Sequence, residues 1–193
     1  MPDEPDDLDG LERWAAEARA RDAADARTRE RWLRTQAEED ARLRQVLQGL
    51  AERATTVTAA TSSGRHLTGR LLRVGDDFVL LESPGGRLNL IALAALGWCR
   101  AVRGERRRPE PAVGPDPALD PGLDASAAAL VDVLAHAAER RPRLLVHAGS
   151  AALTGELRSV GVDLLVLETA EDPPALVYVR LPSVSDISFL DSG

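Results

Sequence analysis

Residues 67–83 read LTGRLLRVGDDFVLLES, and residues 153–169 read LTGELRSVGVDLLVLET. Nine of the 17 aligned positions are identical. The segments that precede these stretches also match, since Val46-Leu47 and Ala51-Glu52-Arg53 reappear as Val133-Leu134 and Ala138-Glu139-Arg140. A repeat of this kind indicates two copies of one structural unit, and we expect each copy to begin with a helix.

Five short strands are expected after the helix of each unit. The first strands are placed at residues 55–58 and 144–146, where residues that suit a pleated surface gather. The second and third strands flank a turn in which Gly supplies a positive φ and Asp bonds the nearby backbone. These turn residues are Gly75 and Asp77 in the first unit and Gly161 and Asp163 in the second. The fourth and fifth strands are expected at residues 89–93 and 98–102, and at residues 177–181 and 187–190.

Proline and glycine separate the two units. Residues 104–123 contain enough of both to prevent regular structure, so they are predicted to form a linker. The segment from Leu8 to Arg53 lacks proline and is rich in Ala, Glu, Arg and Leu, which predicts either one long helix or two. The expected domains are therefore an acidic tail and helix over 1–42, a first unit over 43–103, the linker over 104–123, and a second unit over 124–193.

The pattern within each unit resembles the Sm-like (LSm/Hfq-type) small β-barrel. That family has a helix followed by five bent strands, with Gly-x-Leu early in the second strand and an Asp at the hairpin tip. The resemblance rests on Gly69, Leu71 and Asp77 in the first unit and on Gly155, Leu157 and Asp163 in the second. It implies a mainly β fold of two tandem five-stranded barrels, each preceded by a helix, plus a long N-terminal helical segment. Tudor-like and SH3-like barrels produce similar patterns.

The RNA-binding residues of that family are not matched in this chain. The family has an Asn shortly after the Asp, and an Arg-Gly pair between the last two strands. Here Phe78-Val79-Leu80 follows Asp77, and Ala95-Leu96-Gly97 precedes the last strand. The second unit departs from the family in the same way. No RNA-binding residue is therefore assigned from the resemblance.

Charge is distributed unevenly along the chain. All 24 basic residues are Arg, and the formal net charge is −7. Residues 51–108 carry a net charge of +5, whereas residues 1–50 carry −4 and residues 109–193 carry −8. The arginines of the first unit could contact phosphates, an acidic protein surface or only water, and these alternatives stay open. The candidate nucleic-acid-binding residues are Arg65, Arg70, Arg73, Arg87, Arg100 and Arg103.

Neither a catalytic site, a metal site nor a cofactor is expected. The three histidines have no acidic or Cys neighbour at ligand spacing, and no acid, base and nucleophile converge. The single cysteine, Cys99, excludes an internal disulfide framework and fits a reducing compartment. The acidic N-terminus is unlike a signal peptide, and no apolar run reaches the roughly 20 residues of a membrane-spanning helix. The expected location is the cytoplasm.

These observations predict a non-catalytic interaction or assembly protein. Its two units would pair with each other, with another protomer or with a protein partner, and their opposite net charges favour such pairing. The alternative is an RNA- or DNA-binding regulator that uses the arginines of the first unit. The identity of the ligand, the oligomeric state and the relative placement of the two units stay open.

Overall fold

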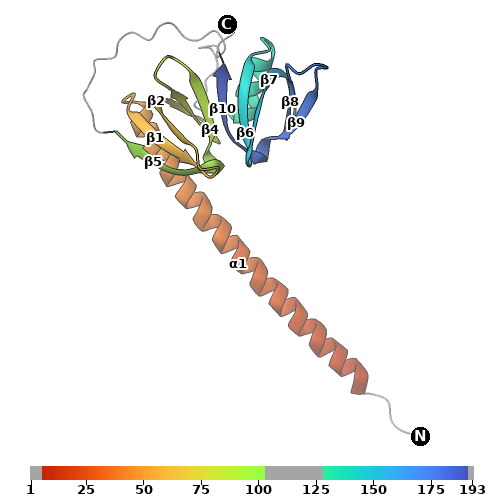
Figure 1. The fold of residues 1–193 in the computed structure, drawn as a ribbon. Helices are drawn as coiled ribbons and strands as arrows, with labels where there is room; N and C mark the ends of the chain where they lie inside the picture. The colour runs from red at the N-terminus through yellow and green to blue at the C-terminus, as the bar shows by residue number, and fades with distance from the viewer. Residues whose placement is uncertain (1–5, 103–127, 191–193) are drawn as a thin grey trace. The chain divides into compact units, whose positions relative to one another are not determined.

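One antiparallel β-sheet of ten strands forms the body of the protein (Figure 1). The computed structural model describes residues 6–102 and 128–190, and for several residues of the N-terminal helix it describes the backbone alone. The strand order is β5-β1-β2-β3-β4-β10-β6-β7-β8-β9, so β5 and β9 are the two edges of the sheet. The chain divides into two compact units, Met1–Val46 and Leu47–Gly193, and each is described by itself.

The first half of the sheet begins where helix α1 (Asp6–Ala51) ends. The last turn of α1 brings Leu47, Leu50 and Ala51 against the core of this half. A 3-10 turn, η1, leads from β4 to β5, and β5 returns to pair with β1. The elements are β1 (Thr56–Thr61), β2 (His66–Val74), β3 (Phe78–Glu82), β4 (Leu88–Ala92), η1 (Leu93–Ala95) and β5 (Leu96–Ala101).

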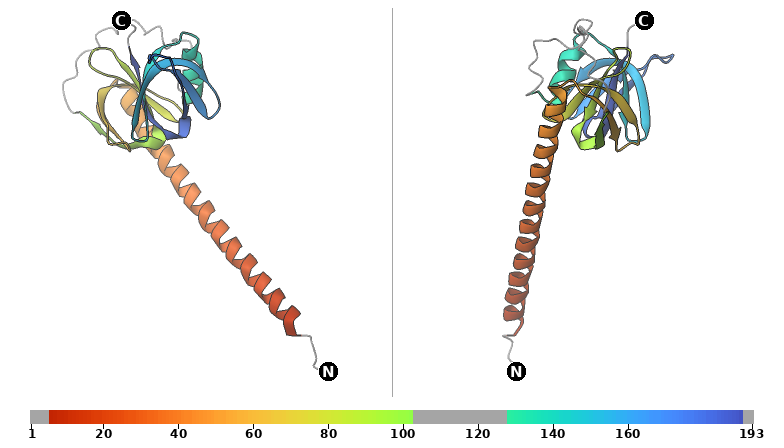
Figure 2. Two further views of the ribbon diagram at one scale, coloured as in Figure 1. Left: turned by 45° about the vertical axis from the view of Figure 1, so that its right-hand side comes forward. Right: turned by 90° about the vertical axis from the view of Figure 1, so that its left-hand side faces the viewer.

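The second half repeats this order of elements. Its helix lies against β7 (Figure 2), and its last strand, β10, returns to pair with β6 as β5 does with β1. The sequence repeat is therefore visible as two halves with the same strand order. The elements are α2 (Leu130–Ala138), β6 (Arg143–Ala148), β7 (Ala151–Val160), β8 (Leu164–Glu168), β9 (Leu176–Arg180), η2 (Leu181–Ser183) and β10 (Val184–Leu190).

The repeated Gly-x-Leu motif has a steric cause. A Cβ atom at Gly69 would lie 2.4 Å from the backbone oxygen of Glu82, and one at Gly155 would lie 2.6 Å from that of Glu168. Just after these glycines the pairing register shifts by one residue, both between β2 and β3 and between β7 and β8. Such bulges bend a strand. Glycine is kept in both halves because the neighbouring backbone occupies the space of a side chain.

The turn glycines do not have the conformation that the sequence predicted. Among the described glycines, positive φ occurs at Gly64, Gly85, Gly86 and Gly149, and neither Gly75 nor Gly161 is one of them. At Gly75 the constraint is again steric, because a Cβ atom would lie 2.2 Å from the ring of Phe78. This turn is shaped by the packing of an aromatic ring.

The predicted fold of two separate five-stranded barrels, a tandem of small domains, is wrong. β10 pairs with β4 as well as with β6, and the two halves are thereby joined into one sheet that does not close. Alone, β4 and β10 would each leave a row of unpaired backbone groups. Their pairing satisfies these groups and buries Leu90 and Ile187, which are 1% and 0% exposed. β4 and β10 lie side by side in the middle of the sheet (Figure 1).

The larger hydrophobic core crosses this junction, which is why the halves are not independent. Phe78, Leu80, Leu88 and Leu90 of the first half belong to the same buried cluster as the core of the second half. The second-half members are Ala128, Leu130, Val133, Leu134, Ala137, Leu144, Val146, Leu157, Leu165, Leu167, Val179, Val184, Ile187 and Phe189. A smaller cluster lies within the first half and includes Leu47, Val57, Leu71, Val79 and Ile91.

The N-terminal segment forms one helix and not two, since α1 runs unbroken from Asp6 to Ala51. Within the unit Met1–Val46, Glu17 and Arg21 form an ion pair at 3.2 Å, and Glu30 and Arg34 form one at 3.4 Å. Pairs with this i,i+4 spacing and orientation stabilise a helix by a few tenths of a kcal/mol, ~0.2–0.5 each. Residues 1–5, the predicted linker over 104–123 and Arg103 lie outside the described residues.

Candidate functional site

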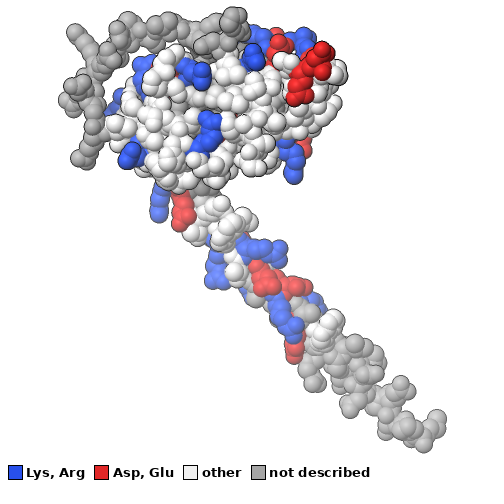
Figure 3. All heavy atoms as spheres, viewed as in Figure 1, with Lys and Arg blue, Asp and Glu red and all other residues white. Residues whose placement is uncertain are grey.

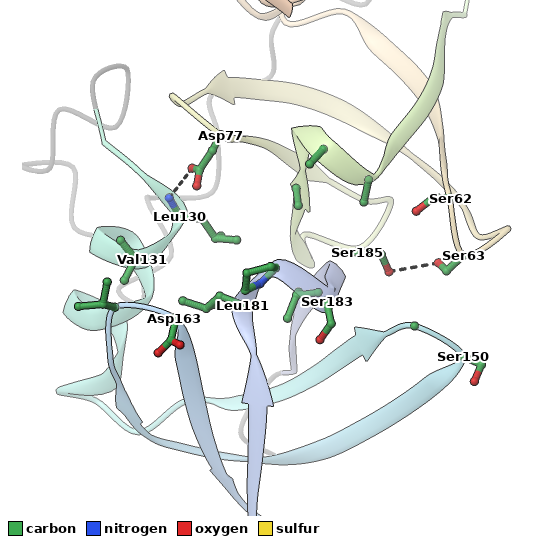
Figure 4. Close-up of a pocket in the computed structure, with 17 residues that line it drawn as sticks. Ser62, Ser63, Asp77, Leu130, Val131, Ser150, Asp163, Leu181, Ser183 and Ser185 are labelled. Carbon is green, nitrogen blue, oxygen red and sulfur yellow. Dashed lines mark hydrogen bonds between the residues drawn. The ribbon is translucent and has the colours of Figure 1, made fainter. Parts of the chain in front are cut away.

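An open pocket of about 650 Å³ lies where the two halves meet. Equivalent parts of both halves line it: the hairpin tips with Asp77 and Asp163, and the 3-10 turns η1 and η2. The two aspartates lie at one end of the pocket, and Ser62, Ser63 and Ser185 lie at the other (Figure 4). Hydroxyl groups and carboxylates suit a neutral or cationic polar group. A phosphate would meet both carboxylates, so this pocket does not favour nucleic acid.

Asp77 connects the pocket to helix α2. Its Oδ1 accepts a hydrogen bond of 2.6 Å from the backbone N–H of Leu130, the first residue of α2. The residue before the helix, Ala129, has no side chain that could cap it, and Asp132 accepts a bond of 3.1 Å from the Ala129 N–H. A carboxylate at a helix N-terminus also meets the positive end of the helix dipole. Asp77 therefore does more than shape its own turn.

A buried ionic cluster lies beside the pocket and is centred on Asp186 of β10. The side chain of Asp186 is completely buried, and its Oδ1 lies 3.5 Å from Arg65 Nε and 3.2 Å from His147 Nδ1. Its Oδ2 accepts a hydrogen bond of 3.0 Å from the hydroxyl of Ser185. Ser185 in turn lies 3.1 Å from the hydroxyl of Ser63. Arg65 and Ser63 come from the first half, and the other three residues come from the second.

The contacts of His147 indicate a neutral imidazole. Arg65 can only donate, and its guanidinium lies within hydrogen-bonding distance of both ring nitrogens, 2.8 Å from Nδ1, so this contact opposes protonation of the ring. Burial lowers the pKa of His147; the nearby Asp186 carboxylate opposes this shift, and Arg65 adds to it. Arg65 is therefore the cation that compensates the buried carboxylate.

The cluster contains Ser, His and Asp but lacks the order of a catalytic triad. In a triad the imidazole lies between the serine hydroxyl and the carboxylate. Here Ser185 donates directly to Asp186, and among the described residues no serine hydroxyl bonds the ring of His147. The arrangement neutralises a buried charge at the junction and ties Arg65 of one half to β10 of the other.

The two edges of the sheet carry exposed apolar side chains. Trp98 on β5 is 46% exposed, and Leu176 and Tyr178 on β9 are 53% and 68% exposed. These strands correspond to β10 and β4, which pair inside the chain. The register equates Tyr178 with Leu90 and Leu176 with Leu88, and both of those leucines are buried at the internal junction. An interface that the chain uses internally is thus left open at both ends.

The predicted arginines that the structure describes differ in their surroundings. Arg70 on β2 pairs with Glu82 on β3 at 2.5 Å, and Arg65 is held by the ionic cluster. Arg73 on β2, Arg87 between β3 and β4, and Arg100 on β5 are exposed. On the face of the body seen in Figure 3, basic side chains are scattered among uncharged ones. Nucleic-acid binding by these residues stays a prediction.

Sequence reasoning did not identify Asp186 or the site around it. The only signal was an acidic residue inside an apolar strand, between Val184 and Ile187. The sequence around His147 gives no sign of an ionic partner, because Asp186 and Arg65 are 39 and 82 positions away in the chain. The open edges were equally hidden, since they depend on how the strands are ordered.

Comparison with known proteins adds no family. No protein-family model matches the chain, and no curated protein matches it in sequence. The described residues hold no group of three or more His, Cys, Asp or Glu side chains placed to bind a metal ion. No helix among them is both long and apolar enough to cross a membrane.

Proposed function

We propose that this protein is a non-catalytic assembly protein whose units join through the edges of the sheet, β5 of one chain pairing with β9 of the next. The observation that supports the proposal most strongly is the β4–β10 pairing inside the chain. It joins β4, the fourth strand of the first half, to β10, the fifth strand of the second half. The two free edges are the counterparts of these strands: β9 is the fourth strand of the second half, and β5 is the fifth strand of the first. The lone Cys99 fits a cytoplasmic location.

The internal junction supplies the register of the proposed contact. Asp186 pairs with Ile91 and Ile187 with Leu90. When the strand pairings of the two halves are aligned, Cys99 takes the position of Ile187, and Tyr178 takes the position of Leu90. Cys99 of one chain would therefore lie directly opposite Tyr178 of the next. Cα atoms of opposed residues in an antiparallel pair are about 4.5–5.5 Å apart, which is within reach of a disulfide.

Charge and exposure also favour a second copy of the chain as the partner. The sequence range of the first half is basic and that of the second half is acidic, and a β5–β9 contact brings unlike halves together. Burial of Trp98, Leu176 and Tyr178 would remove large apolar side chains from water. An edge strand without a partner presents unpaired backbone groups to which a strand of another chain can pair.

A single substitution tests this contact in the full chain. Tyr178→Cys should form a disulfide with the native Cys99 of the next chain under copper-phenanthroline oxidation, giving dimers and higher multimers on a non-reducing gel. Because burial raises the pKa of Cys99, the oxidation is done at mildly alkaline pH.

Two controls make the result specific. Val162→Cys places a thiol at a position that is 95% exposed but lies in the turn between β7 and β8, and it should give no multimers. Cys99→Ser in the Tyr178→Cys chain should abolish them. If Tyr178→Cys cross-links no more than Val162→Cys, the β5–β9 contact is wrong.

A further inference from the structure

Two exposed tryptophans lie on one face of α1 within the unit Met1–Val46. Trp14 is 65% exposed and Trp32 is 63% exposed. They are separated by 18 residues, which is five full turns of about 3.6 residues, so both side chains start from the same line along the helix. Each tryptophan offers about 150–250 Å² of surface that is favourable to bury. A helix with two of them in line presents an anchor at each end of one stretch.

The charged residues between the tryptophans have a matching symmetry. Arg21 and Asp25 are exposed and lie within about 20° of the line that joins Trp14 and Trp32. The two tryptophans are equally distant from residue 23, and so are Arg21 and Asp25. A second copy of the helix, antiparallel and related by a two-fold axis at residue 23, would place each Trp14 against a Trp32. It would also place each Arg21 against an Asp25.

We propose that α1 pairs with α1 of a second chain in this antiparallel register, over residues 14–32. A parallel, in-register pair would instead oppose Arg21 to Arg21 and Asp25 to Asp25, and like charges repel. The ion pair between Arg21 and Glu17 does not compete, because a guanidinium has five N–H donors and can hold two carboxylates. This contact is independent of the proposed β5–β9 contact, so either one can be correct without the other.

Disulfide mapping tests the register in the full chain with Cys99→Ser as background. One preparation carries Arg21→Cys and the other carries Asp25→Cys with an added mass tag, and the two are mixed in a glutathione redox buffer. The antiparallel register predicts that the mixed 21–25 disulfide exceeds either homodisulfide several-fold. Arg19→Cys mixed with Arg27→Cys is the matched control. These positions are also equidistant from residue 23 but lie about 140° from the tryptophan line, so they should give no mixed product.

Sedimentation velocity tests the tryptophan anchors. Every chain in this experiment also carries Tyr178→Lys. A lysine on the edge strand β9 disfavours pairing with another strand, so the dimer that is measured reports on helix pairing alone. Combined Trp14→Ala and Trp32→Ala should convert the helix-paired dimer to a monomer. Leu33→Ala, which removes a side chain that is 59% exposed and about 100° from the tryptophan line, should leave the dimer intact. Dominant 21–21 and 25–25 disulfides, or a dimer that survives loss of both tryptophans, would overturn the proposal.

Discussion

The carboxylate of Asp77 accepts a hydrogen bond of 2.6 Å from the backbone N–H of Leu130, 53 positions further along the chain. Asp77 lies at a hairpin tip of the first half, whereas Leu130 begins the helix of the second. The backbone of the same tip also bonds to the segment before the helix, since the N–H of Asp76 donates to the carbonyl of Ala128 at 3.1 Å. The start of α2 is therefore determined by the other half of the repeat.

Asp77→Ala should destabilise the protein by about 1 kcal/mol, the usual cost of removing a side chain that caps a helix. Asp163→Ala is the control, because Asp163 holds the equivalent hairpin position, and among the described residues no hydrogen bond is found to its carboxylate. Urea unfolding of both variants measures the difference. Equal losses in the two variants would mean that the turn itself, and not the helix cap, needs the aspartate.

Gly69→Ala and Gly155→Ala should each lower the free energy of unfolding by about 1–3 kcal/mol, as overpacking does elsewhere. A methyl group at either position would overlap the backbone oxygen of the neighbouring strand, at 2.4 Å and 2.6 Å. Gly97→Ala is the matched control on β5, where the nearest atom, the Ala60 oxygen, is 3.5 Å away. Thermal or urea unfolding checks all three, and a Gly97→Ala loss as large as the others would contradict the steric explanation.

Arg65→Met should destabilise the protein by about 3 kcal/mol, because it leaves Asp186 buried without its cation. Adding Asp186→Asn removes the charge that has lost its partner. The double variant should therefore be more stable than the sum of the two single losses predicts, by about 1 kcal/mol or more. A double-mutant cycle by urea denaturation measures this coupling. Strict additivity would show that Arg65 does not compensate Asp186.

The free energy of unfolding should fall as the pH is lowered through the ordinary pKa of histidine, 6.5. His147 has a lowered pKa in the folded protein, so below pH 6.5 the unfolded chain takes up a proton that the folded chain resists. The loss should level off once the pH is below the folded-state pKa. His147→Gln should flatten this part of the profile. A His147→Gln profile identical to that of the parent would refute the assignment.

Local features of the fold could be predicted from the sequence because the same sequence pattern occurs in both halves of the chain. The paired motifs at Gly69 and Gly155 indicated matching strands, and the turns at Asp77 and Asp163 lie between strands in both halves. Each of these features depends on residues close together in the chain. Such residues leave a local pattern of glycine, aspartate and alternating apolar positions.

The joining of the halves could not be predicted in the same way. It depends on which strand pairs with the free edge of β4. The apolar sequence of β4 would suit pairing within a closed barrel as well as pairing with a strand of the other half. The ionic cluster had the same difficulty, because Arg65, His147 and Asp186 come together only after β10 has paired with β6. The open edges of β5 and β9 follow from the same pairing, so the site could be found only with the topology known.

The covalent fusion of two unlike halves limits the assemblies that this sheet can make. Each chain brings one basic half and one acidic half, and β5–β9 pairing always sets a first half beside a second. Any array built this way holds an even number of halves, whatever its size, with charge alternating along it. Under the proposed β5–β9 contact, a closed ring of this protein therefore cannot hold an odd number of halves, whereas separate single-unit chains could form one.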